Sequence, residues 1–252
     1  SYDAKTILRA ISFYNLGYTF QMANKQMSKH FRKNIPLSTL QSWLKEYSNT
    51  CTFSRLRKDA LKLSSPGNMI FTQSLQHKQI YKYQLHKAKL ELVKAELPEQ
   101  KFQLLKAYLE KIPSEKFPHH IFQPKQEELE ELTRSSQIKF ETLDFVKVEK
   151  QNLSNTLASL GLQLANNNKQ RHEAIQNFML INDRTTIACE APVYLTADDI
   201  KYFNARTPIK LNFLEGCQTP ITGHIDILQI RNGMLHILDY KPEADKIKPI
   251  EQ

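Results

Sequence analysis

The chain is poor in glycine, cysteine and tryptophan, and it has no long apolar run. Its 252 residues include six glycines, three cysteines and one tryptophan. Three cysteines that lie far apart form neither a disulfide framework nor a CxxC metal site, which favours a reducing compartment. No apolar run approaches the roughly 20 residues of a membrane span. We therefore expect a folded protein of the cytoplasm, nucleoid or nucleus, without a membrane partner.

The net charge of +9 is concentrated near the start of the chain. Residues 1–66 hold 11 Lys/Arg against three Asp/Glu, whereas residues 124–252 hold 15 against 18. A basic segment is typical of a module that binds a polyanion, and an acidic one can hold metal ions. Ordinary solvated helix faces would give the same excess, so charge alone leaves both interpretations open.

The basic segment is predicted to form three short helices. Apolar residues recur at helical spacing over residues 3–15, and Thr19 can cap a second helix that runs to about Phe31. A third helix is expected to begin at Ser38, with Gln41 completing a capping box. Its buried face is expected to carry four residues: Leu40, Trp43, Leu44 and Tyr47.

The outward face of the third helix carries side chains that can reach DNA. Five hydrogen-bonding residues are expected there: Ser38, Thr39, Gln41, Ser42 and Lys45. Such side chains contact base edges and phosphates when a recognition helix lies in the major groove. The stretch from Tyr14 to Tyr47 resembles the helix-turn-helix domains of transposases and recombinases, which implies DNA binding. A plain helical bundle has the same spacing and stays an alternative.

The middle of the chain is predicted to be helical. Residues 70–95 give one long helical pattern and residues 99–112 a second. The interleaved Lys, Tyr and His of the first helix suit either a nucleic-acid groove or a solvated helix with buried tyrosines. We divide the chain into three parts: a helix-turn-helix domain (1–63), a helical connecting region (64–150) and a C-terminal core (151–252).

The C-terminal core contains a strong hairpin signal. Asn232-Gly233 is typical of a two-residue turn between antiparallel strands. Counting outward from this turn places Asp226 opposite Asp239 on one face of the sheet. Lys241 lies two residues further on and points to the same face. The hairpin is therefore expected to gather two carboxylates and one ammonium.

Two like charges that face each other destabilise a strand pair, and the apolar neighbours of these aspartates make the repulsion stronger. A divalent cation removes the conflict, and carboxylate oxygens suit Mg²⁺ or Mn²⁺. The ammonium of Lys241 can then hold or help to deprotonate a water, as in metal-assisted phosphodiester hydrolysis. An exposed charge cluster without a metal is the alternative.

The segments GHID and LDYK resemble motifs of the PD-(D/E)xK nuclease superfamily, particularly its RecB-like branch. His172-Glu173 in the segment RHEAIQ matches a third motif on an upstream helix. The resemblance covers about residues 150–252 and implies a restriction-endonuclease-like α/β core with a small mixed sheet. It implies metal ligands at four positions: His172, Asp226, Asp239 and the backbone carbonyl of Tyr240.

The same resemblance implies further roles. Lys241 would position the attacking water and steady the charge that develops on the phosphate. Glu173 would orient His172 or bind a second metal, and Glu190 is a weaker ligand candidate. The family pattern continues with a helix carrying Q-x-x-x-Y, of which Gln252 matches only the first residue. We therefore expect a core cut short at its last helix.

These observations predict an α+β protein that acts as a metal-dependent DNA nuclease. Mg²⁺ or Mn²⁺ would be its cofactor and DNA its partner, with catalytic residues Asp226, Asp239 and Lys241. By analogy the setting would be recombination, transposition or defence. The main alternative is a DNA-binding or assembly protein with an inactive nuclease-like core, and an RNA-directed enzyme is a third. The sequence leaves a homodimer open.

Overall fold

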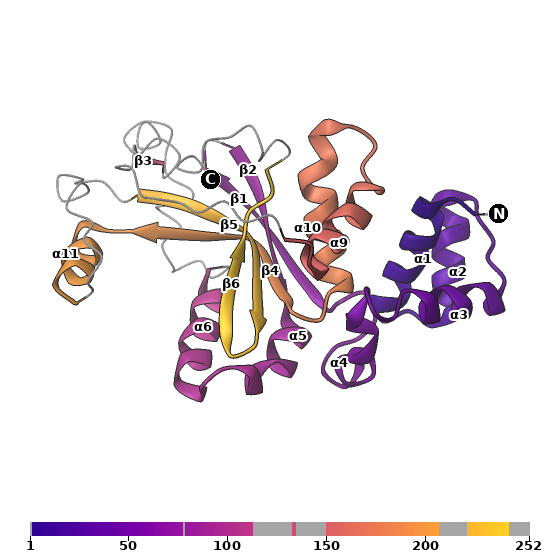
Figure 1. Ribbon diagram of the computed structural model, residues 1–252, viewed down its shortest axis with the longest axis horizontal. Coiled ribbons are helices and arrows are strands. Elements are labelled where there is room, and N and C mark those ends of the chain that lie inside the picture. Colours follow the sequence, from indigo (N-terminus) through magenta and orange to yellow (C-terminus); the bar gives the residue numbers. More distant parts are fainter. Residues whose placement is uncertain (1, 78, 113–132, 135–149, 207–220, 242–252) are drawn as a thin grey trace.

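The computed structural model describes residues 2–77, 79–112, 133–134, 150–206 and 221–241. It shows the α+β fold that the sequence predicts, with one sheet between two groups of helices (Figure 1). The N-terminal helices lie at one end of the molecule and α11 (Ala197–Arg206) at the other. No helix of the described ranges is long and apolar enough to cross a membrane.

The basic segment folds into the three predicted helices. They are followed by a 3-10 turn and a short fourth helix: α1 (Ala4–Asn15), α2 (Phe20–Phe31), α3 (Leu37–Glu46), η1 (Thr52–Arg55) and α4 (Arg57–Leu63). Thr19 caps α2 as expected, because its side chain accepts a hydrogen bond from the N–H of Met22. On α3, Leu40 and Trp43 are buried.

The predicted capping box of α3 is wrong. The helix begins at Leu37, Pro36 is its N-cap, and no side chain caps it. Proline fixes its own φ near the helical value and needs no N–H, so it can start the helix one residue early. Ser38 therefore lies inside the first turn, where it is exposed.

The predicted long helix over residues 70–95 is also wrong. Its first part is a hairpin of β1 (Ile70–His77) and β2 (Gln79–His86), and only α5 (Lys87–Leu92) is helical, followed by η2 (Lys94–Glu96). Residues 81–86 alternate between apolar and polar side chains, a period of two that favours a strand over a helix. The strand pairs with β4, where Leu85 faces Ala188.

The second helix of this region, α6 (Glu99–Lys111), is confirmed. The described parts of the predicted helical connecting region nevertheless contribute three strands to the sheet: Ile70–His77, Gln79–His86 and Thr133–Arg134. Its remaining parts, residues 113–132 and 135–149, lie outside the described residues.

Within the described residues the sheet has six strands and is mixed. The remaining strands are β3 (Thr133–Arg134), β4 (Thr186–Leu195), β5 (Ile221–Arg231) and β6 (Met234–Leu238). The order is β1-β2-β4-β5, and the far edge of β5 pairs with β3 in parallel and with β6 antiparallel. Strand β5 is paired along both of its edges, and its residues contribute to two cores: Ile227 to one, Leu228 and Ile230 to the other.

Two hydrophobic cores hold the sheet. On one face α9 (Leu153–Leu162) and α10 (Arg171–Asn182), linked by η4 (Asn168–Gln170), contribute Leu157 and Phe178 to a core that extends into α1–α3. On the other face α6 contributes Phe102 and Leu109. Asn15 of α1 donates a buried hydrogen bond of 2.9 Å to Asn182 of α10. The N-terminal helices are thus packed directly on α10.

Candidate functional site

The hairpin forms in the predicted register. Asn232 and Gly233 have φ values of 52° and 73°, as a type I′ turn requires, and Arg231 pairs with Met234. The ladder extends to the pair Ile227–Leu238. Asp226 and Asp239 follow immediately at its open end, and their side chains interact.

Asp226 also receives contacts from outside the hairpin. Its Oδ2 lies 2.8 Å from Nε2 of His172, in the first turn of α10, and accepts a 3.1 Å hydrogen bond from the N–H of Tyr240. The His172 nitrogen is 3.9 Å from a carboxylate oxygen of Glu190. One ligand atom each from His172, Glu190 and Asp226 lies within 4.8 Å of the others. We call these three residues together with Asp239 the acidic cluster.

Gln176 connects the acidic cluster to α10. Its Nε2 donates to Glu190 Oε1 at 2.6 Å and to the backbone carbonyl of Asp226 at 3.3 Å. The residue is buried and was not predicted. The sequence could have indicated Gln176 by its spacing, because a side chain four residues after His172 lies on the same helix face.

The backbone of Glu190 has a left-handed conformation, with φ of 50°. Its neighbours pair regularly with β5, as Cys189–Ile227 and Ala191–Ile225. Cys189 and Glu190 both contact Gln176, so the usual alternation of a strand breaks at this point. A left-handed non-glycine residue costs free energy and is typical of a functional position. The distortion turns the Glu190 carboxylate toward α10.

Lys241 lies beside the second aspartate. Its Nζ is 2.8 Å from Oδ2 of Asp239, and both side chains are about one third exposed (37% and 36%). The ammonium is therefore held at the rim of the acidic cluster, where solvent or a substrate can also reach it.

The two aspartates have opposite pKa shifts. Burial and the neighbouring Asp226 raise the pKa of Asp239. Burial also acts to raise the pKa of Asp226, but hydrogen bonds with His172, Asp239 and the Tyr240 N–H outweigh it and lower that pKa overall. Like charges in contact cannot both ionise freely. The negative charge is thus kept on Asp226, and Asp239 takes up a proton more readily.

The other two members of the cluster also hold protons more tightly. The hydrogen bond to Asp226 raises the pKa of His172. Burial raises the pKa of Glu190, although Gln176 partly offsets it. Raised pKa values in a partly buried acidic group mean that the site gains from a bound proton or cation.

Glu173 is not brought to the acidic cluster. Its carboxylate accepts a 2.7 Å hydrogen bond from Lys82 of β2, and both side chains are about half exposed. Tyr240 is placed beside the cluster by its N–H, with its ring centroid 6.1 Å from that of His172.

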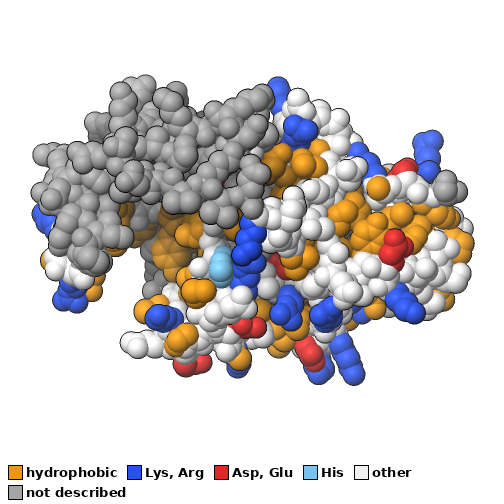
Figure 2. Space-filling model, in the orientation of Figure 1, with side chains coloured by type: hydrophobic (Ala, Val, Ile, Leu, Met, Phe, Trp, Pro, Cys, Tyr) orange, Lys and Arg blue, Asp and Glu red, His pale blue; other side chains and the backbone are white. Residues whose placement is uncertain are grey.

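The five predicted DNA-binding residues all lie on α3, where Thr39 is partly buried and the other four are exposed: Ser38, Gln41, Ser42 and Lys45. Figure 2 shows that, on the face it presents, basic side chains are spread over the N-terminal helices rather than gathered into one patch.

A scan against models of known protein families found no match to this chain, and searches of curated proteins and of solved structures found none either. A functional proposal for this chain therefore rests on the geometry of the site.

Proposed function

We propose that the protein is a metal-dependent DNA nuclease that hydrolyses phosphodiester bonds. The observation that carries the proposal is the convergence of His172, Glu190 and Asp226, from α10, β4 and β5, beside the Asp239–Lys241 pair. Three carboxylates and an imidazole next to an ammonium combine ligands for a cation with a donor for a phosphate oxygen.

The donor set fits a hard divalent cation. Carboxylate oxygens suit Mg²⁺, and an added imidazole nitrogen also suits Mn²⁺. His172, Glu190, Asp226 and Asp239 would hold the ion. When bound, such an ion polarises a phosphoryl oxygen and lowers the pKa of a bound water. Relief of repulsion among these carboxylates would favour its binding.

The surrounding residues would position the reacting groups. Gln176 fixes the Glu190 carboxylate, and the Tyr240 N–H fixes that of Asp226. The Lys241 ammonium can donate a hydrogen bond to the attacking water or to a phosphate oxygen, where negative charge grows during hydrolysis. Its partial exposure leaves it accessible to a strand that lies over the hairpin end.

The exposed face of α3 supports DNA as the substrate. Ser38, Gln41, Ser42 and Lys45 offer hydrogen-bonding groups on a short helix that follows a tight break, the arrangement that major-groove recognition uses.

A cleavage assay with the full chain tests this proposal. Supercoiled plasmid and single-stranded DNA are incubated with Mg²⁺, with Mn²⁺ and with a chelator. We expect metal-dependent cleavage that Asp226→Asn and Lys241→Ala each reduce at least a hundredfold. Glu173→Gln, which removes a carboxylate from the same helix as His172 but outside the cluster, leaves it unchanged.

Cleavage that survives both substitutions would contradict the site. DNA binding without cleavage under any metal condition would favour a binding or assembly protein instead. Competition by RNA decides which nucleic acid is the substrate.

A further inference from the structure

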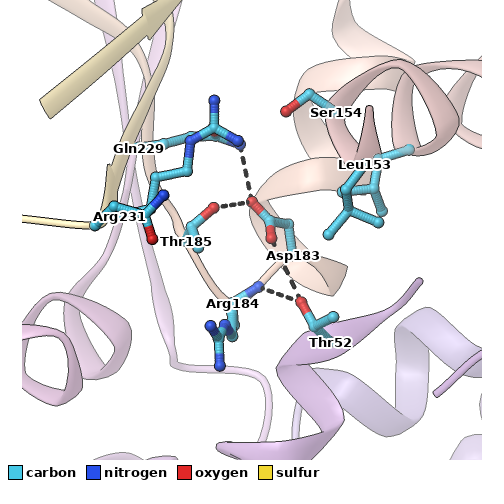
Figure 3. A pocket seen from close by; sticks show the side chains of 10 residues that line it. Thr52, Leu153, Ser154, Asp183, Arg184, Thr185, Gln229 and Arg231 are labelled. Atoms are coloured by element: carbon cyan, nitrogen blue, oxygen red, sulfur yellow. Dashed lines mark hydrogen bonds between the residues drawn. The ribbon is translucent and has the colours of Figure 1, made fainter. Parts of the chain in front are cut away.

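A second polar site lies beyond the acidic cluster on the same strand. It is a cavity of about 140 Å³ where the start of α9, the first residues of β4 and the hairpin turn meet (Figure 3). Gln229 lines it and lies three residues beyond Asp226 on β5, which is roughly 10 Å along a strand. The nuclease proposal gives this cavity no role.

The floor of the cavity is a buried carboxylate that is already hydrogen-bonded to its neighbours. Asp183 is buried, and its Oδ2 accepts hydrogen bonds from Thr185, Thr186 and Gln229 at 2.6–2.9 Å. In Figure 3 Asp183 lies between Arg231 on one side and Leu153 and Ser154 on the other. The carboxylate thus fixes the positions of Thr185, Thr186 and Gln229. The other polar groups that line the cavity can contact a ligand.

These walls are rich in donors. Arg231 and the exposed Arg184 line the cavity, as does the hydroxyl-bearing Ser154. Leu153 and Ser154 are the first two residues of the ten-residue helix α9, and the N-cap side chain of Asn152 accepts only from the N–H of Asn155. The N-terminal N–H groups of a helix favour a bound anion.

Two buried polar atoms at the cavity have no hydrogen-bond partner among the described residues. They are Oε1 of Gln229, a residue only 1% exposed, and Nε of Arg231. Buried groups of this kind cost free energy when left unpaired. One is an acceptor and the other a donor, so a matching ligand carries both acceptor oxygens and an O–H group.

We propose that this cavity binds a phosphate monoester or inorganic phosphate. A phosphate with an ester bond at only one oxygen offers several acceptor oxygens to the arginines and the helix N-terminus, and its protonated form offers an O–H to Gln229. The cavity volume is well below the roughly 300–1,000 Å³ of sites that enclose drug-sized ligands, so a nucleoside would stay outside. The ligand is therefore a free phosphate or the terminal phosphate of a nucleic-acid strand.

Binding measurements with the full chain test this inference without relying on cleavage. Inorganic phosphate is titrated by calorimetry at constant ionic strength. Oligonucleotides with a 5′-phosphate or a 5′-hydroxyl are titrated by fluorescence anisotropy in the presence of a chelator. The variants are Arg231→Gln and Arg184→Gln, with Arg206→Gln on α11 as the matched loss of one guanidinium elsewhere. Thermal unfolding confirms that each variant is folded.

We expect phosphate binding that each cavity variant weakens about tenfold and that Arg206→Gln leaves unchanged. A 5′-phosphate that strengthens oligonucleotide binding several-fold, with the gain lost in Arg231→Gln, identifies a strand end as the source. Equal binding of both oligonucleotides, with phosphate binding still dependent on the arginines, identifies free phosphate. Absent phosphate binding, or phosphate affinity that neither folded cavity variant changes, overturns the inference.

Discussion

Glu190 lies across from Asp226 on neighbouring strands, and its backbone has a left-handed φ of 50° where a regular strand would be extended. The pairs on both sides of it are regular, so the distortion is confined to the residue that delivers a carboxylate to the acidic cluster. The left-handed backbone at Glu190 lowers the local stability of the strand, and it also directs the carboxylate into the acidic cluster.

The backbone strain at Glu190 can be separated from its side-chain contacts. Glu190→Gly and Glu190→Ala both remove the carboxylate and the contact with Gln176. Only glycine adopts a left-handed conformation without strain. We expect the glycine variant to be more stable than the alanine variant by about 1 kcal/mol in urea unfolding. Equal stability of the two variants would show that the residue is not strained in solution.

Asp239→Asn tests the repulsion between the paired aspartates. Without divalent ions, removal of one of two interacting carboxylates is expected to raise the thermal midpoint by about 2 °C. The same change should reduce the additional stabilisation that Mn²⁺ or Mg²⁺ gives to the unmodified chain. Asp198→Asn, on the exposed surface of α11, is the control and should change neither value. A lower midpoint for Asp239→Asn in the absence of metal contradicts this account.

The free energy of unfolding is expected to depend on pH through the buried Lys89. Its buried ammonium donates to the carbonyls of Leu180, Asp183 and Thr186, and burial lowers its pKa to about 7. In the unfolded chain a lysine side chain has a pKa of about 10.4. Above about pH 7 the unfolded chain therefore binds more protons than the folded one, and stability rises with pH.

This rise in the free energy of unfolding should be measurable between about pH 7 and about pH 8.5. At higher pH Cys51 and Cys189 oppose it, because burial raises their pKa values in the folded protein. Urea unfolding at several pH values measures the slope, and Lys89→Met should flatten it. A variant with an unchanged slope would show that another group is responsible.

Lys45→Ala tests DNA binding by α3. Loss of one phosphate contact is expected to weaken binding and to reduce the slope of log K against log salt by about one. Lys201→Ala on α11 removes the same charge far along the chain and should leave that slope unchanged. A salt series that is identical for Lys45→Ala and the unmodified chain would rule out this contact.

The parts of the site that sequence reasoning reached are those set by local rules. A type I′ turn needs two positive φ values, so Asn232-Gly233 fixed the hairpin register and with it the proximity of Asp226 and Asp239. The helical pattern around His172 likewise placed that residue on α10. Gln176 was within reach of the same reasoning, because it follows His172 by one helical turn.

The sequence by itself determined the α+β class, the three N-terminal helices, the hairpin and its register, since each depends on neighbours within a few residues. Only the tertiary structure decided that residues 70–77 and 79–86 are strands, that Glu190 joins the acidic cluster and that Glu173 does not. These outcomes depend on β2 pairing with β4, on a distorted backbone at one residue and on Lys82 reaching Glu173. Contacts between residues about a hundred positions apart have no periodic signature in the chain, and packing overrides local propensity where the two compete.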